Sequence, residues 1–376
     1  MEFYQVKDYS ANAFKRSYGR SAYLKLRGKI KSIAVYKSGG GLGDLVQSIP
    51  FFRSFRKMFP GVQITYIGLY QRPRCDTLFD NIPYIDEYIE YVRPGRERSF
   101  RQYYRFLKQF SGKFDLIVDT QPKFAPSFYL WLLKPKYFLS RNLFFSHWRI
   151  ILNPGTKVHI AAKMLSLVRA LGLKEIDLSP GIEMPEKYLS LAKEYMKAIT
   201  GRLISILPGA GHPYKMWPKE KFASLGDRFY AMGYKVMLIG AESERELLLE
   251  VAGMMKNKPI IPLADEARFG QDPVYSIGLF KSSALTVGCD CGGLHLASLA
   301  GCPVIGIYGP TNPIKSGPLG EKNAVIYRGL GCSPCRLRDC KLLRRCLEEI
   351  TPEEVIKAAN LILGTPFYPK QGHPFS

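Results

Sequence analysis

Several side chains that could do chemistry follow short apolar runs in this sequence, at points where a strand is expected to end and a helix to begin. The first is Asp44, which comes directly after the glycine-rich stretch GGGLG at residues 39–43. Open α/β sheets bind their ligands at this edge, so Asp44 is a candidate carboxylate base for a hydroxyl proton. An aspartate at a helix start is also commonly an N-cap, and this motif alone leaves both roles open.

A lysine suited to a phosphate lies in the stretch LPGAGHPYKMWPKEKF, residues 207–222. A strand is expected to end in its small residues, and Pro218 suits the first position of the next helix. On the loop between them, the ammonium group of Lys215 can neutralise a phosphate as a point charge. The alternative is a solvated surface lysine beside a packing Trp217.

The most informative stretch is VGCDCGGLHLASLAGCPVIGIYGPTNP, residues 287–313. It predicts a strand, then Asp290, a pair of glycines and a helix that begins near Leu294. Free backbone N–H groups and the positive end of that helix can bind a pyrophosphate, and the glycines permit close approach. His295 can donate to a phosphate oxygen, although a structural histidine is an alternative. Thr311, after the next strand, would border the same pocket.

Two glutamates follow another expected strand end. Glu242 and Glu244 lie in the stretch LIGAESERELLLE, where a carboxylate can accept hydrogen bonds from ribose hydroxyls. A glutamate that opens a helix often merely favours the helix dipole, so this assignment also has an alternative.

Four of the eight cysteines lie close together near the C-terminus, with the spacing C-x2-C-x4-C-x5-C. Such spacing is typical of metal sites but only moderately specific, and disulfides are disfavoured in a cytosolic chain. A bound metal or cluster, a redox-sensitive pair and plain buried thiols all remain open. The four residues are Cys332, Cys335, Cys340 and Cys346.

The elements that would position these residues alternate along the chain. Apolar, β-branched runs predict strands at 32–38, 62–70, 85–91, 114–121, 202–211, 235–241, 258–265, 283–290 and 303–310. Helical patterns separate many of them, with one helix expected to start or bend at Pro50 and a last helix near 352–363. This alternation predicts an α/β fold of two facing Rossmann-like doubly wound domains with a cleft between them.

Composition bounds the class of protein. An apolar fraction of 46% is that of a globular chain rather than a disordered one. We find no apolar run of about 18 residues and no N-terminal signal core, so we expect a cytoplasmic protein. The net charge of +22 is concentrated in residues 1–200. Basic, aromatic stretches at 96–110 and 128–150 suit an anionic partner such as lipid or nucleic acid, unless the charge is merely solubilising surface.

Four stretches, taken together and in order, closely resemble glycosyltransferase family 9, the bacterial ADP-heptose:lipopolysaccharide heptosyltransferases. They are GDLVQSIPFFRSFRKMFPGVQITYIG, LPGAGHPYKMWPKEKF, GAESE and DCGGLHLASLAGCPVIGIYGPTNP. The cysteine-rich tail is similar to a segment common in that family. The resemblance covers roughly residues 32–360, and the joint pattern is much more specific than any single motif.

The resemblance implies a GT-B fold, with a basic N-terminal arm at 1–31, an acceptor-binding domain at 32–185 and a nucleotide-sugar-binding domain at 186–376. The family's proposed base matches Asp44. The residues implied in nucleotide-sugar binding are Lys215, Glu244, Asp290, Cys291, Gly292, Gly293, His295 and Thr311. Many relatives have Thr or Ser where this chain has Cys291, a change expected to weaken one hydroxyl contact.

The implied reaction is an inverting transfer of heptose from ADP-heptose to a sugar hydroxyl of the lipopolysaccharide core, either Kdo-lipid A or heptosylated core. Asp44 takes the hydroxyl proton, and Lys215, His295 and helix amides stabilise the leaving diphosphate, so no metal is required. The expected partners are ADP-heptose, a lipid-linked anionic sugar acceptor and the inner-membrane surface, with no nucleic acid. The expected location is peripheral, on the cytoplasmic face of the inner membrane.

Three other functions compete with this interpretation. A related glycosyltransferase could use another nucleotide sugar or a surface polysaccharide acceptor. An NAD-dependent enzyme needs G-x-G-x-x-G, but Asp44 stands where the third glycine belongs. A non-enzymatic nucleic-acid or lipid-binding protein is suggested by the charge alone.

Overall fold

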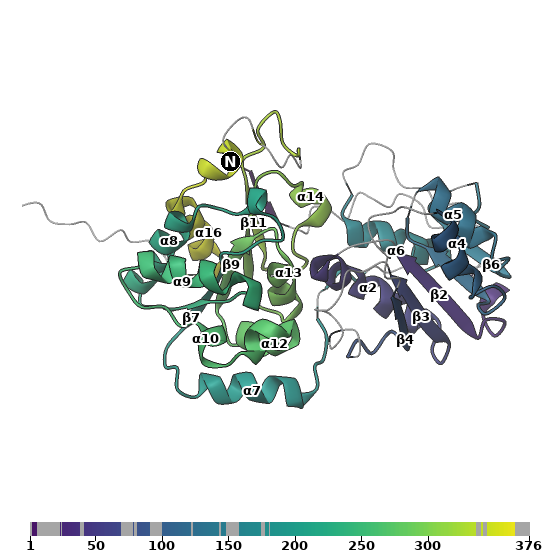
Figure 1. Cartoon of the computed structure of the whole chain (residues 1–376), viewed down its shortest axis with the longest axis horizontal. Helices are drawn as coiled ribbons and strands as arrows, with labels where there is room; N and C mark the ends of the chain where they lie inside the picture. Colours follow the sequence, from purple (N-terminus) through teal and green to yellow (C-terminus); the bar gives the residue numbers. More distant parts are fainter. Residues whose placement is uncertain are drawn as a thin grey trace, which may run out of the picture. The chain divides into compact units, whose positions relative to one another are not determined.

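The computed structural model of the chain forms two compact units (Figure 1). It describes residues 2–5, 23, 25–37, 41–68, 78, 81–90, 100–121, 123–142, 144–147, 158–173, 177–179, 181–335, 340 and 344–364. The unit that we call the first domain comprises residues 7–185 and 314–319, and the second domain comprises 1–6, 186–313 and 320–376. Gly39, Gly40 and parts of the basic stretches at 96–110 and 128–150 lie outside the described residues.

The first domain is built on a five-stranded parallel sheet in the order β4-β3-β2-β5-β6. Its strands are β2 (Ser32–Lys37), β3 (Gln63–Gly68), β4 (Glu87–Glu90), β5 (Leu116–Asp119) and β6 (Tyr137–Ser140). The three inner strands β3, β2 and β5 are almost wholly buried, as expected for a sheet covered on both faces. The short strand β6 is absent from the sequence prediction, because its four residues lie inside a long aromatic run without a strand pattern.

Helices cover both faces of this sheet. They are α2 (Leu42–Met58), α4 (Phe100–Lys108), α5 (Phe124–Trp131) and α6 (Ile160–Ala170). Helices α2 and α6 pack together, and Phe52 of α2 stacks edge-on against Tyr66 of β3 with ring centroids 5.1 Å apart. Residues of α4 and α5 join a separate apolar cluster with β2, β5 and β6.

Helix α2 begins at Leu42 and passes through Pro50 without ending. A start at Pro50, one of the two alternatives that the sequence suggested, is therefore wrong. The buried aromatic side chains Phe51, Phe52 and Phe55 lie on the following turns, and their burial outweighs the hydrogen bond that a proline cannot donate.

The second domain contains a six-stranded sheet in the order β1-β11-β10-β9-β7-β8, parallel except for β1. Its strands are β1 (Glu2–Gln5), β7 (Leu203–Leu207), β8 (Lys235–Leu238), β9 (Leu285–Cys289), β10 (Val304–Tyr308) and β11 (Ala324–Tyr327). The expected strand at 258–265 is reduced to a single bridge between Met237 and Ile260. Residues 2–5, expected in an irregular arm, instead pair with β11.

The helices of the second domain are mostly short. They are α7 (Glu186–Met196), η2 (Pro213–Lys215), α8 (Lys219–Ala231), η3 (Glu242–Glu244), α9 (Arg245–Met254), α10 (Pro262–Asp265), α11 (Arg268–Gln271), α12 (Pro273–Lys281), α13 (Gly292–Leu299), α14 (Pro313–Ser316, which ends in the first domain), α15 (Arg345–Glu348) and α16 (Pro352–Leu363). Helices α8, α9 and α16 share one apolar cluster with the sheet. Among the described residues, no helix is long and apolar enough to cross a membrane.

Candidate functional site

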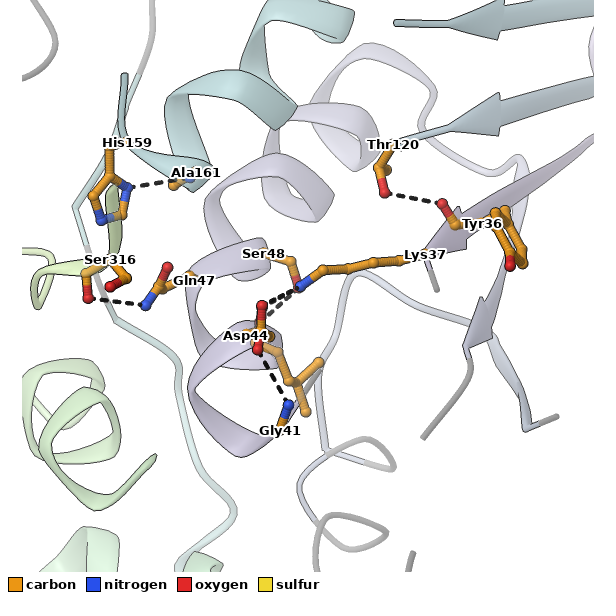
Figure 2. A network of polar contacts seen from close by, with 11 residues as sticks. Tyr36, Lys37, Gly41, Asp44, Gln47, Ser48, Thr120, His159, Ala161 and Ser316 are labelled. Atoms are coloured by element: carbon orange, nitrogen blue, oxygen red, sulfur yellow. Dashed lines mark hydrogen bonds and ion pairs between the residues drawn. The ribbon is translucent and has the colours of Figure 1, made fainter. Parts of the chain in front are cut away.

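Asp44 lies in the first turn of α2, immediately beyond the carboxyl end of β2 (Figure 2). Its Oδ2 accepts a hydrogen bond of 3.2 Å from the backbone N–H of Gly41, so the carboxylate does satisfy a free N–H at the helix start. The same side chain keeps 40% of its surface exposed. Capping therefore occupies one side of the carboxylate and leaves it open to solvent and to a ligand.

A buried lysine holds the other carboxylate oxygen. The Lys37 ammonium donates to the backbone oxygen of Asp44 at 3.0 Å and to its Oδ1 at 3.3 Å, and the Lys37 side chain is only 3% exposed. Burial lowers the pKa of Lys37 from its ordinary value, while the charge and hydrogen bond of Asp44 oppose that change. Sequence reasoning missed this residue, because a lysine at a strand end usually reaches solvent.

Lys215 and Asp290 form an ion pair in the second domain. The Lys215 Nζ lies 2.8 Å from Asp290 Oδ2, with the side chains 21% and 11% exposed. Lys215 follows β7 and Asp290 follows β9, and these strands are neighbours in the sheet. The sequence-predicted residues of two separate motifs are thus brought together at one sheet edge.

His295 completes a small polar cluster with this pair. Its Nε2 lies 3.9 Å from Asp290 Oδ1, and its side chain is buried. Burial alone would raise the pKa of Asp290, but hydrogen bonding to His295 and the charge of Lys215 outweigh burial and hold that pKa well below its usual range. Asp290 is therefore an ionised carboxylate that orients the Lys215 ammonium group and the His295 imidazole.

Helix α13 begins at Gly292, directly beside this cluster. A Cβ on Gly293 would lie 3.3 Å from the Leu207 side chain at the end of β7, so the glycine permits close packing of helix start and strand. Burial raises the pKa of the N-cap thiol Cys291 to about 12, which leaves it neutral at pH 7. The backbone N–H groups of this helix start point outward from the helix end, where they can donate to an anion.

Glu244 reaches the same edge from the far side of β7. Its Oε2 accepts a hydrogen bond of 2.8 Å from the backbone N–H of Ala241. Its carboxylate lies against two glycines, since a Cβ on Gly209 or Gly240 would lie 2.0 Å or 3.0 Å from its oxygens. Glu242, the alternative glutamate, is exposed and pairs with Arg245.

Thr311 follows β10, the strand beside β9. Its side chain is buried, and its Oγ1 has no hydrogen-bond partner among the described residues. An unsatisfied buried hydroxyl destabilises a fold by about 1–3 kcal/mol, so a ligand oxygen at this position would be favourable. The strands β8, β7, β9 and β10 thus present the candidate residues Glu244, Lys215, Asp290 and Thr311 in spatial order.

The cysteine-rich segment braces the loops of this site. Arg344 donates to the backbone oxygens of Pro213 and Met216, which flank Lys215, and the Cys335 N–H donates to the oxygen of Pro310 at 3.0 Å. Trp217 is buried, and its indole N–H donates to Ile350, so its expected packing role is confirmed.

Four thiols line one cavity in this segment, together with Tyr214 and Pro310. They are Cys332, Cys335, Cys340 and Cys346. Nevertheless, among the residues for which a structure is described, no group of three or more His, Cys, Asp or Glu side chains is arranged to hold a metal ion. Binding of a metal by these cysteines stays a prediction from their spacing.

A family model described as glycosyltransferase family 9 (heptosyltransferase) matches residues 103–345. Lipopolysaccharide heptosyltransferase 3 of Escherichia coli is 23% identical, over 76% of this chain and 86% of its own length. The region matched by the family model includes all the candidate residues of the second domain.

Solved structures are similar over most of the chain. A glycosyl transferase family 9 protein from Veillonella parvula is 26% identical with a TM-score of 0.71, covering 89% of this chain and 98% of that one. E. coli ADP-heptose lps heptosyltransferase II is 18% identical with a TM-score of 0.66, covering 89% and 98%. The likeness confirms the predicted fold class, two Rossmann-like α/β domains of the GT-B type.

Proposed function

The chain belongs to glycosyltransferase family 9 and is a glycosyltransferase, and from this premise we propose that it transfers heptose from ADP-heptose to lipopolysaccharide core. The acceptor would be a sugar hydroxyl of a lipid-linked, anionic core saccharide, and the anomeric carbon would be inverted. The observation that carries the donor assignment is the meeting of Lys215, Asp290 and His295 beside the start of α13.

The donor diphosphate would bind at this cluster. Lys215, the His295 imidazole and the backbone N–H groups at the start of α13 would donate to the diphosphate, where negative charge grows as ADP leaves. Asp290 carries negative charge itself, so we assign it the role of holding Lys215 and His295 rather than of contacting phosphate. Glu244 would accept from the ribose hydroxyls, and the Oγ1 of Thr311 would donate to a donor oxygen.

Asp44 would act as the general base. Its exposed carboxylate takes the proton of the acceptor hydroxyl while that oxygen forms a bond to the anomeric carbon. The bond from the anomeric carbon to the phosphate oxygen breaks with its electron pair moving to ADP. Lys37 holds Asp44 through one contact to its backbone oxygen and one to its carboxylate, which reduces the motion needed to reach the hydroxyl. The charge on ADP is met by protein groups, so we expect no metal requirement.

Membrane association is supported by exposed aromatic side chains in the first domain. Phe124, Trp131 and Phe144 are 60%, 45% and 87% exposed, and the rings of Phe124, Trp131 and Phe145 pack in one cluster. Aromatic side chains next to basic residues suit the interface of an anionic membrane. We therefore propose peripheral binding to the cytoplasmic face of the inner membrane.

The test is a donor screen with the purified full chain and a Kdo-bearing acceptor saccharide. Mass spectrometry would detect the acceptor plus one heptose with ADP-heptose, and NMR of the product would establish inversion. Product from a UDP-sugar but not from ADP-heptose would overturn the donor assignment. Transfer only to a surface polysaccharide would overturn the acceptor assignment.

A further inference from the structure

The first domain contains basic side chains that the proposed reaction does not use. Residue Asp119 of β5 pairs with Ser140 of β6 in the parallel register, so Arg141 begins at the same sheet edge as Lys37 and Asp44. The Nε of Arg141 is buried and has no hydrogen-bond partner among the described residues. The nearby Asp119 carboxylate is engaged by Ser127, Ser140 and the backbone N–H of Gln121.

A second cation approaches from α6. Its N-cap is His159, whose Nδ1 accepts from the Ala161 N–H at 3.1 Å, and Lys163 lies one turn later on the same helix. Burial lowers the pKa of Lys163, and the positive charges of Arg141 and Lys315 lower it further. The positive charges of Arg141, Lys163 and Lys315 therefore lie near one another and repel.

The third cation comes from a distant part of the sequence. Residues 314–319 follow β10 but pack within the first domain. There, the oxygen of Gly317 lies 2.9 Å from His159 Nε2, and the oxygen of Ser316 accepts from Gln47 at 3.4 Å. Because Nδ1 of His159 is the acceptor for Ala161, its Nε2 carries the proton and donates to Gly317. These two bonds hold the exposed Lys315 near Lys163.

The segment also lies close to the candidate base. Gln47 is three residues after Asp44 on α2, and side chains at this spacing are neighbours, about 5–6 Å apart at Cβ. Figure 2 shows Gln47 reaching from α2 toward Ser316, while Asp44 of the same helix faces Lys37. Ser316, the chain neighbour of Lys315, therefore contacts a residue about one helical turn from Asp44.

We propose that Arg141, Lys163 and Lys315 bind an anionic group of the acceptor, a phosphate or a carboxylate, and thereby set which hydroxyl reaches Asp44. This inference rests on the proposed function, because that function identifies the anionic ligand as the acceptor. Relief of the repulsion between the ammonium groups would make anion binding favourable, and charge-assisted hydrogen bonds would add to it. Residues 314–319 would then take a direct part in acceptor binding by the first domain.

The experiment is isothermal titration of the full chain at fixed ionic strength with two probes. One is the deacylated, bisphosphorylated Kdo-bearing headgroup of lipid A, and the other is the same saccharide after phosphatase treatment. The variants are Lys163→Gln, Lys315→Gln and the double variant, and Lys322→Gln is a control because Lys322 is an exposed lysine of the second domain. Circular dichroism would verify that each variant folds.

We expect each single variant to raise the Kd of the phosphorylated probe about tenfold, since a charge-assisted hydrogen bond supplies roughly this factor. Lys322→Gln should leave it unchanged. A loss of affinity confined to the phosphorylated probe identifies phosphate as the bound anion. An equal loss of affinity for both probes identifies the Kdo carboxylate. The proposal is overturned if the double variant binds both probes as tightly as Lys322→Gln does, or if the unaltered chain binds neither.

A transfer assay separates this inference from the proposed function. If the unaltered chain binds the headgroup through these lysines but transfers nothing from ADP-heptose, the proposed function fails and the anion site stands. If it transfers heptose and the double variant keeps the same KM for the acceptor, the anion site fails and the function stands.

Discussion

Replacing Lys215 by Met tests whether the ion pair at the donor site is both a structural contact and a phosphate-binding group. The change leaves Asp290, which is 11% exposed, without its cation. Breaking a buried ion pair costs about 3–5 kcal/mol, and the 21% exposure of Lys215 reduces the expected loss to about 2–3 kcal/mol. The loss arises because the remaining carboxylate is poorly solvated.

The matched control is Lys219→Met. Lys219 lies four residues later and pairs with Glu250 at 2.5 Å, but the two side chains are 39% and 52% exposed. A surface pair of this kind contributes about 0–1 kcal/mol, so we expect little change in stability and none in ADP affinity.

A double variant, Lys215→Met with Asp290→Asn, separates stability from binding. The neutral amide removes the unpaired charge and should restore about 1–2 kcal/mol of the lost stability. It cannot restore a cation for the diphosphate, so ADP affinity should stay about tenfold to a hundredfold weaker than in the unaltered chain.

Urea unfolding would measure the stability through the fluorescence of Trp217, which is buried in the second domain. The other two tryptophans, Trp131 and Trp148, would be replaced by Phe, so that the signal reports this domain alone. Calorimetric titration would give the ADP affinity. A Lys215→Met variant as stable as Lys219→Met, or one that binds ADP as tightly, would contradict these two roles of Lys215.

Three further experiments test Lys37, Asp119 and the expected independence of metal. Lys37→Met should lower kcat about tenfold with ADP affinity and folding stability unchanged, because Met fills the buried site without fixing Asp44. Lys57→Met, at an exposed position on α2, the helix that carries Asp44, should have no effect in the same kinetic assay. Burial raises the pKa of Asp119 to about 6, above its value of about 3.9 in the unfolded chain, so the folded state binds more protons between these values. Stability measured by urea unfolding should therefore fall by about 2–3 kcal/mol as pH rises from about 4 to about 6, and a fall of the same size in Asp119→Asn would contradict this assignment. Heptosyl transfer should continue at the same rate in excess EDTA, and loss of activity that Mg²⁺ restores would show a metal requirement.

The sequence predicted most of the framework because the signals are local. Buried apolar runs such as Leu203–Leu207 and the glycines after them predicted both the strands and the edge where the candidate residues lie. The same local patterns explain why Lys215 and Asp290, from separate motifs, could be expected to meet: their strands end at the same edge of a parallel sheet.

The features that were missed depend on contacts between distant residues. Strand β1 has only four residues and is defined by its pairing with β11, more than 300 positions away in the sequence. Lys315 reaches the first domain because His159 and Gln47 hold its segment. Lys37 was also missed, although its partner Asp44 lies only seven residues away in the sequence.

The most direct test of the central claim is the rate of heptosyl transfer by Asp44→Asn, measured by mass spectrometry with ADP-heptose and a Kdo-bearing acceptor. The amide keeps the shape of the side chain but is a very poor proton acceptor, so we predict a loss of about 10²–10⁴-fold in kcat. The affinity for ADP should be unchanged, because Asp44 belongs to the first domain and the donor residues to the second. Transfer by Asp44→Asn at a rate within tenfold of the unaltered chain would contradict the account.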